Sequence, residues 1–387
     1  MRTEQLSPVN FANIDTPFYF YDIGVLEHTL QLIQESIADG DIVVHYAVKA
    51  NSNKEILQLI GSAGFGADCV SYGEINAAIA AGIPANKIVF AGVGKTDYEI
   101  SMSLKDGVGC YNVESIEELG NIADIASNQG IVAPVALRVN PNIDAHTHRY
   151  ITTGLEENKF GISLSRLDDA VKMAHECKNI NLIGLHFHIG SQILTMSPFE
   201  TLAELVNTLV SRYKDRGIEF QSINVGGGLG IDYTRPDSTA DFGAFFNTLK
   251  SRIKLSRGQQ LHCELGRSVV AQCGSLISRV VYVKNGVDKK FVILDAGMNC
   301  LIRPALYGAH HSIQNLTALY EHRKKMEAYD IVGPICESSD VFAVDEKMIE
   351  TKRGDIIAIR SAGAYGESMA SNYNIRPLNM PRYSKLS

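Results

Sequence analysis

The sequence lacks the features that mark several other classes of protein. No run approaches the roughly 18 consecutive apolar residues of a spanning helix, so we expect no membrane partner. The first ten residues contain no apolar stretch of the signal-peptide kind, which predicts a cytoplasmic protein. Acidic residues outnumber basic ones, 43 to 36, and the resulting net charge of −7 argues against nucleic acid as a partner.

Cysteine spacing excludes a further group of functions. None of the 7 cysteines forms a Cys-x-x-Cys pair, so zinc ribbons and thioredoxin chemistry have no support, and we expect no metal site. The odd count favours a reducing compartment, in which most of these thiols serve as small buried hydrophobic groups.

Short runs of β-branched and aromatic residues alternate with segments long enough for a helix. The predicted strands are 42–48, 65–70, 87–91, 108–113, 134–140, 182–188, 221–225 and 260–265. Eight strands alternating with helices are typical of an α/β fold, the (β/α)8 TIM-type barrel, whose active sites lie at the C-terminal ends of the strands. A doubly wound sheet is the competing fold, but its Gly-x-Gly-x-x-Gly fingerprint is missing after the first strand.

Several predicted helices have a start signal that is independent of periodicity. In a capping box, a Ser or Thr side chain and a Glu three residues later satisfy backbone N–H groups at the helix N-terminus. The matching pairs are Ser52 with Glu55, Ser71 with Glu74, Thr96 with Glu99, Ser115 with Glu118, and Ser197 with Glu200. Their positions after predicted strands support the alternation.

The alternation ends near Arg267. From there the chain reads mainly as strands, at 274–284, 290–294, 341–344 and 356–360. An N-terminal strand at 16–21 would be an unpaired edge unless it joins the same sheet. We therefore expect a barrel domain at 24–266 and a β-rich C-terminal domain, at 267–387, that also takes residues 1–23.

Two features at strand ends point to chemistry. Lys49 follows an apolar strand, so it would point into the barrel mouth, where loss of water lowers its pKa and leaves an amine nucleophile. Taken alone, a strand-end lysine that reaches solvent is the commoner case. Segment 226–230 has glycine at four of its five positions, which would let backbone N–H groups surround a phosphate. A tight turn alone would need fewer glycines.

Other candidate residues remain open between two interpretations. His186 and His188 alternate on one strand and point the same way, but no third metal ligand is near, and an imidazole beneath an aromatic cofactor is as reasonable. Glu264 ends the last predicted strand and could keep a pyridine nitrogen protonated, or simply pair with a nearby base. Cys336 and Glu337 lie in a polar turn, where a reactive thiol is an alternative to a buried spacer.

Eight segments in this order resemble the fold-type III pyridoxal-phosphate decarboxylases, most closely those that act on diaminopimelate. The likeness runs from about residue 16 to about residue 374. The matching segments are HYAVKAN at 45–51, GADCVS at 66–71, HFHIGSQ at 186–192, the glycine run at 226–230, ELGR at 264–267, RPALY at 303–307, CESSD at 336–340 and GAYG at 363–366. Eight segments in register are very specific. One departure is Leu265, where relatives usually have proline.

The resemblance implies how the cofactor would be held. Lys49 would hold pyridoxal phosphate covalently through its amine, His188 would stack on the ring, and Glu264 would pair with the pyridine nitrogen. Contacts to the phosphate are implied for Ser191, Gly227, Gly228, Gly266 and Arg267. Tyr365 would contact both cofactor and substrate.

For the substrate, the resemblance implies three groups on its distal carboxylate, namely Arg267, Arg303 and Tyr307. Glu337 would lie near the distal amine, and Cys336 would return a proton to the α-carbon after carbon dioxide leaves. Because Cys336 and Glu337 come from the partner subunit in this family, the resemblance implies a homodimer with shared active sites.

The implied reaction is decarboxylation of meso-2,6-diaminopimelate to L-lysine, the last step of lysine biosynthesis. Ornithine, arginine and carboxynorspermidine decarboxylases, alanine racemase and a non-catalytic pyridoxal-phosphate carrier are the alternatives. Arg303 and Tyr307 favour a substrate with a second carboxylate, which ornithine and arginine lack. A racemase would not call for the turn at Cys336, and a carrier would need neither that turn nor the second domain.

Overall fold

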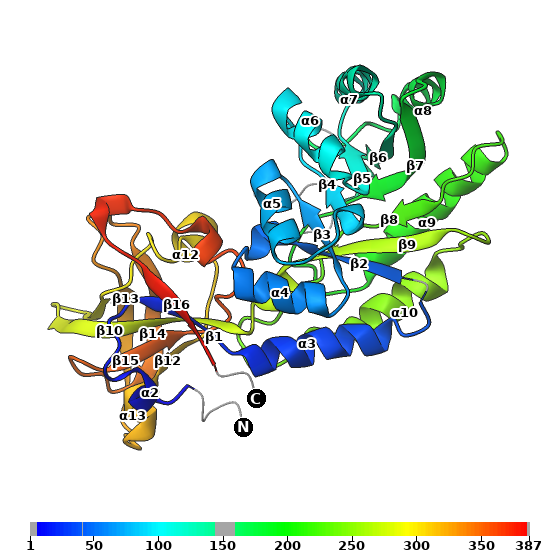
Figure 1. Cartoon of the computed structure of the whole chain (residues 1–387). Helices are drawn as coiled ribbons and strands as arrows, with labels where there is room; N and C mark the ends of the chain where they lie inside the picture. Colours follow the sequence, from blue (N-terminus) through cyan, green and yellow to red (C-terminus); the bar gives the residue numbers. More distant parts are fainter. Residues whose placement is uncertain (1–5, 41, 144–158, 385–387) are drawn as a thin grey trace. The chain divides into compact units, whose positions relative to one another are not determined.

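The structure is a computed structural model that describes residues 6–40, 42–143 and 159–384. Its contacts divide the chain into two compact units, which are described separately below (Figure 1). One unit contains Leu30–Gly230 and Ala240–Gly266, and the other contains Met1–Thr29, Ile231–Thr239 and Arg267–Ser387. No helix in these described ranges is long and apolar enough to cross a membrane.

The first unit is a closed barrel of parallel strands, β2 to β9, that neighbour one another in sequence order. The strands are β2 (Ile42–Ala47), β3 (Gly66–Cys69), β4 (Ile88–Phe90), β5 (Cys110–Val113), β6 (Ala133–Val139), β7 (Ile180–Phe187), β8 (Ser222–Asn224) and β9 (Gln260–Leu265). Pairing of β2 with β9 closes the ring and places His45 opposite Glu264. All eight predicted strands are confirmed, and the closed ring excludes the doubly wound sheet.

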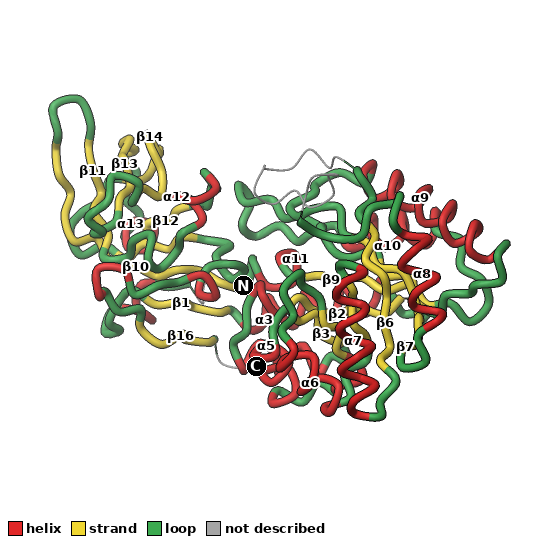
Figure 2. Tube along the Cα trace, turned by 90° about the horizontal axis from the view of Figure 1, so that it is seen from above, coloured by secondary structure: helices red, strands yellow, loops and turns green. Residues whose placement is uncertain are grey.

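Helices alternate with these strands, as the sequence predicts, and appear in red around the yellow barrel strands in Figure 2. They are α3 (Ile23–Ser36), α4 (Lys54–Ser62), α5 (Tyr72–Ala80), α6 (Asp97–Asp106), α7 (Ile116–Gln129), α8 (Leu167–Glu176), α9 (Ser197–Lys214) and α10 (Phe242–Arg252), with short 3-10 turns η1 (Val48–Ala50) and η2 (Ala85–Lys87). Helix α9 shows why they form, because Leu202, Val206 and Leu209 recur at helical spacing and are all buried.

Three of the five predicted helix caps are present, and two are wrong. Ser71, Thr96 and Ser115 each accept a hydrogen bond from the backbone N–H three residues later, and Thr96 completes a full capping box. Helix α4 instead begins after Asn53, without a side-chain cap. Helix α9 already includes Ser197, so its hydroxyl stands one position too late to cap the helix. In both cases the motif lies near the helix start but in the wrong register.

The second unit is built on one β-sheet. Its central path runs β12-β15-β10-β11-β13-β14, with β1 paired to β10 and β16 paired to β1. The strands are β1 (Phe18–Tyr21), β10 (Gly274–Asn285), β11 (Lys290–Leu294), β12 (Ile313–Asn315), β13 (Met326–Val332), β14 (Val341–Ile349), β15 (Ile356–Ile359) and β16 (Asn379–Tyr383). The short helices are α2 (Pro8–Phe11), α11 (Arg267–Val270), α12 (Arg303–Tyr307) and α13 (Leu316–Tyr320), with 3-10 turns η3 (Glu367–Met369) and η4 (Tyr373–Ile375).

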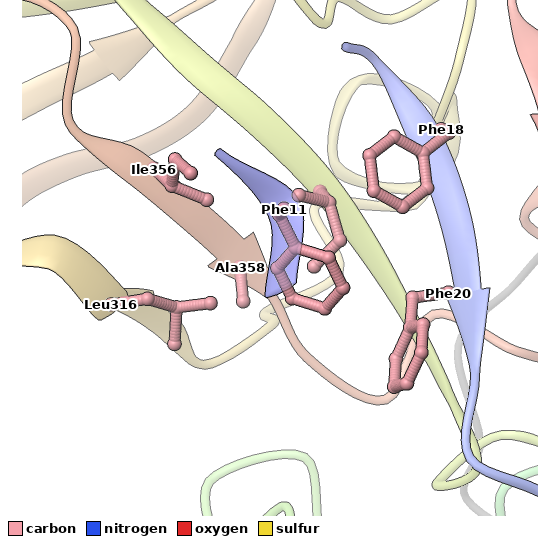
Figure 3. Close-up of a cluster of buried hydrophobic side chains, with 7 residues drawn as sticks. Phe11, Phe18, Phe20, Leu316, Ile356 and Ala358 are labelled. Carbon is pink, nitrogen blue, oxygen red and sulfur yellow. The ribbon is translucent and has the colours of Figure 1, made fainter. Parts of the chain in front are cut away.

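The N-terminal strand joins this sheet, as its sequence predicts. Phe18 lies opposite Ile277 in the antiparallel pair of β1 with β10. Phe18 and Phe20 pack edge-on against Phe11, at centroid distances of 5.7 and 5.1 Å, in a core shared with Leu316, Ile356 and Ala358 (Figure 3). The sequence does not predict three strands of the sheet, β12, β13 and β16, because polar residues interrupt their apolar runs.

One segment of the second unit comes from the middle of the barrel sequence. Ile231–Thr239 follows the glycine run after β8, yet it groups with the β-rich unit, as do residues 24–29. Asp237 of this segment accepts a hydrogen bond from Arg360 at 2.8 Å, and the Tyr233 hydroxyl accepts one from Arg267 at 2.6 Å. These contacts explain why the segment departs from the expected division at residue 266.

Candidate active site

Lys49 lies just beyond the end of β2, in the 3-10 turn η1. Its side chain is 38% exposed, and its ammonium group forms an ion pair with Asp68 of β3, whose side chain is only 1% exposed. Burial and the charge of Glu264 raise the pKa of Asp68, while Lys49 acts in the opposite direction. The other carboxylate oxygen, Asp68 Oδ1, is buried and has no hydrogen-bond partner among the described residues.

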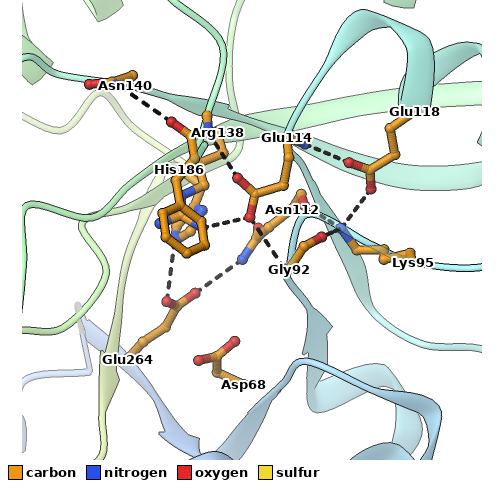
Figure 4. Close-up of polar contacts among 12 residues, drawn as sticks. Asp68, Gly92, Lys95, Asn112, Glu114, Glu118, Arg138, Asn140, His186 and Glu264 are labelled. Carbon is orange, nitrogen blue, oxygen red and sulfur yellow. Dashed lines mark hydrogen bonds and ion pairs between the residues drawn. The ribbon is translucent and has the colours of Figure 1, made fainter. Parts of the chain in front are cut away.

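Glu264 lies near the end of β9, inside the barrel, and accepts hydrogen bonds on both oxygens (Figure 4). Asn112 and Asn224 donate to Oε1 at 3.0 and 2.8 Å, and His186 Nε2 donates to Oε2 at 3.2 Å. Burial alone would raise the pKa of Glu264, but His186 and Lys49 outweigh it and hold the pKa well below its usual range. Glu264 is therefore a buried carboxylate that stays ionised.

His186, near the end of β7, and His188, directly after it, have different surroundings. His186 is 1% exposed, and its second nitrogen, Nδ1, has no partner in the part of the chain that the structure describes. His188 Nδ1 accepts a hydrogen bond from the backbone N–H of Gly227 at 3.2 Å. Burial, reinforced by the charge of Arg138, lowers the pKa of His188 to about 3, so its ring is neutral.

The glycine run is required by close backbone packing. A Cβ on Gly227 would lie 1.9 Å from the carbonyl oxygen of Glu264, and one on Gly226, at φ +68°, would lie 2.3 Å from that of Phe187. Only glycine fits where backbones approach this closely. Gly227 therefore contacts both His188 and the backbone of Glu264. Of the other residues expected at the phosphate, Ser191 is half-buried after β7, and Gly266 directly follows β9.

A second polar network, centred on Lys95, holds the C-terminal ends of β4 and β5 (Figure 4). The Lys95 ammonium is fully buried and donates to the carbonyls of Gly92 and Asn112, both at 2.9 Å, and to Glu118 at 2.6 Å. Its bond to the Asn112 carbonyl fixes the backbone of the residue whose side chain holds Glu264. This buried lysine is structural, because each of its three donors has a partner.

In the β-rich unit, two buried arginines lie near tyrosines. Arg267 is 7% exposed, donates to the Tyr233 hydroxyl at 2.6 Å, and lies 4.9 Å from the centre of the Tyr365 ring. Arg303, at the start of α12, is 5% exposed and lies 4.7 Å from the centre of the Tyr233 ring. Tyr307 ends α12 and contributes to the electrostatic surroundings of both arginines.

Cys336 and Glu337 are exposed on a turn of the same unit. The backbone N–H of Cys336 donates to Asn374 Oδ1 at 3.0 Å, and the Tyr373 hydroxyl donates to Glu337 Oε1 at 2.5 Å. The turn therefore presents a thiol and a carboxylate whose positions are fixed by a neighbouring segment. The structure places these residues and the two arginines in one unit, and Lys49, His188 and Glu264 in the other.

Sequence reasoning missed several residues that shape the site. Asp68 lies in the segment GADCVS at 66–71, whose resemblance implies no role for it. Asn112 and Asn224 could have been found as polar residues at inward positions of barrel strands. Tyr233 and His311, which contact the arginines, lie in loops and give no local signal.

Comparison with known proteins gives a consistent result along the chain. The family model for the pyridoxal-binding domain of pyridoxal-dependent decarboxylases matches residues 24–271. A diaminopimelate decarboxylase from Bacteroides thetaiotaomicron is 56% identical over 371 residues, which cover 95% of each chain.

Solved structures agree over the same length. That of diaminopimelate decarboxylase from Helicobacter pylori, complexed with L-lysine, has a TM-score of 0.92 and 40% identity and covers 98% of this chain and 94% of its own. The one from M. jannaschii, also with L-lysine, has a TM-score of 0.87 and 37% identity and covers 95% of this chain and 87% of its own. The chain therefore belongs to the diaminopimelate decarboxylase family of the pyridoxal-dependent decarboxylases.

Proposed function

We propose that this chain removes carbon dioxide from meso-2,6-diaminopimelate to give L-lysine, with pyridoxal phosphate as its cofactor. Curated diaminopimelate decarboxylases that are 40 to 56% identical over nearly the full length of the chain support this reaction. The observation that carries it in the structure is Arg303. This buried cation has no carboxylate within ion-pair distance among the described residues, and its Nε has no hydrogen-bond partner there. A substrate with a second carboxylate would satisfy it.

The chemistry of the barrel residues fits the cofactor. Lys49 offers an amine for covalent attachment, and Glu264 is an ionised carboxylate of the kind that holds a proton on a pyridine nitrogen. His188 offers a neutral, flat ring for stacking. For the phosphate we propose Ser191, the backbone of Gly227 and Gly228, and the turn at Gly266 and Arg267.

Pyridoxal phosphate, when bound, accepts the electron pair left on the α-carbon as carbon dioxide departs. The residues of this chain make that reaction selective. Asp68 holds the Lys49 ammonium in place, and Asn112, Asn224 and His186 orient Glu264 through donors to both of its oxygens. The charges of His186 and Lys49 keep Glu264 ionised. Because these groups are fixed before substrate arrives, no reorganisation is needed during the reaction.

The substrate residues belong to the β-rich unit. Arg267, Arg303 and Tyr307 would bind the distal carboxylate, for which guanidinium groups are better suited than ammonium groups. Tyr365 would contact both cofactor and substrate. Glu337 would accept a hydrogen bond from the distal amine, and the Cys336 thiol would donate its proton to the α-carbon.

We further propose that the active enzyme is a cytoplasmic homodimer in which Cys336 and Glu337 complete the partner's site. Exposure of both side chains on an ordered turn supports this arrangement. The seven free cysteines are consistent with a reducing compartment. The family match at 24–271 supports a cofactor-binding domain at 24–266, with residues 1–23 and 267–387 as the second domain. By their contacts, residues 24–29 and 231–239 group with that second domain.

Incubation with meso-diaminopimelate and pyridoxal phosphate tests the reaction, with L-lysine measured by mass spectrometry and carbon dioxide by its release. Ornithine and arginine serve as parallel substrates. We expect equal amounts of lysine and carbon dioxide and little turnover of the other two. Preferred turnover of ornithine or arginine, or cofactor binding without release of carbon dioxide, would contradict the proposal.

A separate experiment tests the shared site. Lys49→Ala and Cys336→Ala chains are each expected to be nearly inactive, but hybrid dimers would hold one site with both residues intact. Random mixing should restore about a quarter of wild-type activity, since half of the dimers are hybrids with one complete site. Failure to recover activity after confirmed subunit exchange would place Lys49 and Cys336 of each site in the same chain.

A further inference from the structure

Tyr233 lies between the two buried arginines of the β-rich unit. Its hydroxyl accepts a hydrogen bond from Arg267 Nη1 at 2.6 Å, while its ring lies 4.7 Å from the guanidinium carbon of Arg303. The face of an aromatic ring attracts a cation, and the attraction increases when water is excluded. One side chain thus contacts both cations and fixes their separation.

His311 holds Arg303 from the other side. Its Nδ1 lies 2.9 Å from the carbonyl oxygen of Arg360, which can only accept, so Nδ1 carries the proton. Nε2 is then the acceptor for Arg303 Nη1, at 2.8 Å. The ring also packs edge-on against Tyr233, with centroids 5.0 Å apart. Burial and the charge of Arg303 lower the pKa of His311 to about 3, which keeps this tautomer neutral.

The cluster brings like charges together without a carboxylate in the described part of the chain to balance Arg303. Burial and the nearby charge of Arg267 lower the pKa of Arg303. Hydrogen bonds to a buried guanidinium group are directional, so Tyr233 and His311 determine where the remaining N–H groups of Arg303 point. An anion that binds there meets donors whose orientation has already been set.

We propose that Tyr233 and His311 are positioning residues that orient Arg303 and Arg267 toward the distal carboxylate of the substrate. The inference rests on the proposed function, because it assumes that these arginines bind that carboxylate. Decarboxylation at one end of meso-diaminopimelate leaves the other amino-acid end unchanged. The single carboxylate of L-lysine is therefore the group that the cluster would hold, and cadaverine, which lacks it, is the matched probe.

The test measures L-lysine and cadaverine binding to the holoenzyme by calorimetry, beside kcat and KM for meso-diaminopimelate. In His311→Leu we expect the Kd of lysine and the KM to rise roughly 10- to 100-fold, the effect of losing a hydrogen bond to a charged group. The Kd of cadaverine and kcat should change by less than about threefold, because the lost interaction serves binding alone. His311→Gln keeps both an acceptor and a donor and should recover most of the lysine affinity.

Tyr233 offers an independent pair of variants. Tyr233→Phe removes the acceptor for Arg267 but keeps the ring beside Arg303, so lysine affinity should fall less than in Tyr233→Leu. Tyr329→Phe is the control, since Tyr329 is a buried tyrosine of the same unit whose hydroxyl bonds to Glu327 and Thr351. It should leave lysine affinity unchanged.

Unchanged lysine affinity in both leucine variants would overturn the inference, as would equal weakening of lysine and cadaverine. If His311→Leu does not fold, the Tyr233 variants decide the outcome: wild-type lysine affinity in Tyr233→Leu would overturn the inference. A wild-type enzyme that neither converts diaminopimelate nor binds lysine would instead contradict the proposed function.

Discussion

The two ends of the barrel carry polar side chains on the same strands but control their charge in opposite ways. His262 and Glu264 are two residues apart on β9 and therefore face the same side of the strand. Glu264, toward the C-terminal mouth, accepts hydrogen bonds from three donors and is kept ionised by the charges of His186 and Lys49. His262, toward the N-terminal floor, belongs to a pair of neutral imidazoles.

At the floor of the barrel, His45 and His262 form a hydrogen bond between their rings, so the ring nitrogens that face each other are both paired. His45 Nδ1 lies 3.2 Å from the Lys87 carbonyl and so carries the proton, which leaves Nε2 to accept from His262 Nδ1 at 2.9 Å. The two rings stack at 5.3 Å. Gly66 makes room for them, because a Cβ there would lie 2.6 Å from His45 Nδ1. Burial lowers the pKa of both histidines, that of His262 to about 3.

At the mouth, by contrast, Asp68 Oδ1 and His186 Nδ1 are buried and have no partner within the described ranges. A buried polar atom without a partner costs free energy, so its persistence indicates a binding function. Both ends of the barrel contain polar side chains. They differ because the histidines of the structural end are hydrogen-bonded to each other, while the reactive end keeps buried polar atoms without a partner among the described residues.

The largest test removes the nucleophile at the mouth. Lys49→Ala should lower turnover by roughly a thousandfold or more, because no amine remains to hold the cofactor. Lys87→Ala at the floor is the control and should keep its activity, since the exposed Lys87 ammonium donates to the Gly64 carbonyl and to no other group among the described residues. Borohydride reduction followed by peptide mapping should place the cofactor on the peptide that contains residue 49. Label on any other lysine would refute the assignment.

A second test compares two neutral substitutions on β9. Glu264→Gln keeps the shape but removes the charge, and kcat/KM should fall roughly 100-fold or more. His262→Gln, two residues away, should change kcat/KM by less than about twofold, because His262 hydrogen-bonds to His45 at the floor and contacts none of the groups proposed to hold the cofactor. Steady-state kinetics on both variants provide the measurement. Similar losses in the two would show that the mouth and floor are not functionally distinct.

A third test removes one donor to the ionised carboxylate. Asn112→Ala takes away a hydrogen bond to Glu264 and should raise the pKa of that carboxyl group. Activity should fall by about tenfold, and its acid limb should shift to higher pH, because Glu264 would protonate sooner as the pH falls. The pH profile of kcat/KM checks this. A uniform loss at every pH would assign Asn112 a structural role only.

The smallest effect concerns the stability of the floor. The pKa of His262 is lowered from 6.5 to about 3 by burial, so the unfolded chain binds protons more readily than the folded barrel. The free energy of unfolding should therefore decrease as the pH falls from 6.5 toward 3. Urea titrations at several pH values should show a shallower decrease in His262→Gln. An identical pH dependence in both proteins would mean that the pair does not contribute.

Local patterns in the sequence predict most of the barrel and part of its site. The strands are predicted because each is a short β-branched or aromatic run that alternates with a segment long enough for a helix, and Lys49 and the glycine run stand out at strand ends. The predicted helix caps are correct only where the helix begins in the expected register, as at Thr96, and the predicted cap at Ser197 is wrong because the helix begins one residue too early for it.

The remaining residues depend on contacts between distant parts of the chain. Asn112 and Asn224 are single polar residues on separate strands, and they meet at Glu264 only because the barrel closes. The same holds for Tyr233 and His311, which meet at Arg303 from two loops. Alternation along a strand can mark Asn112 and Asn224 as inward-facing polar residues, but it does not show which side chains they contact. It gives no signal at all for Tyr233 and His311 in their loops, so neither set of contacts could be predicted from the sequence.

Because Ile231–Thr239 groups with the β-rich unit, it limits how chimeric enzymes can be built from this chain and its relatives. A chimera joined at residue 266 would inherit the loop from one parent and its anchors, Arg303 and Arg360, from the other. Modular exchange therefore needs two crossover regions, one around the loop and one after β9. In evolution the two units are expected to have changed together at this loop, even where the rest of each unit diverged freely.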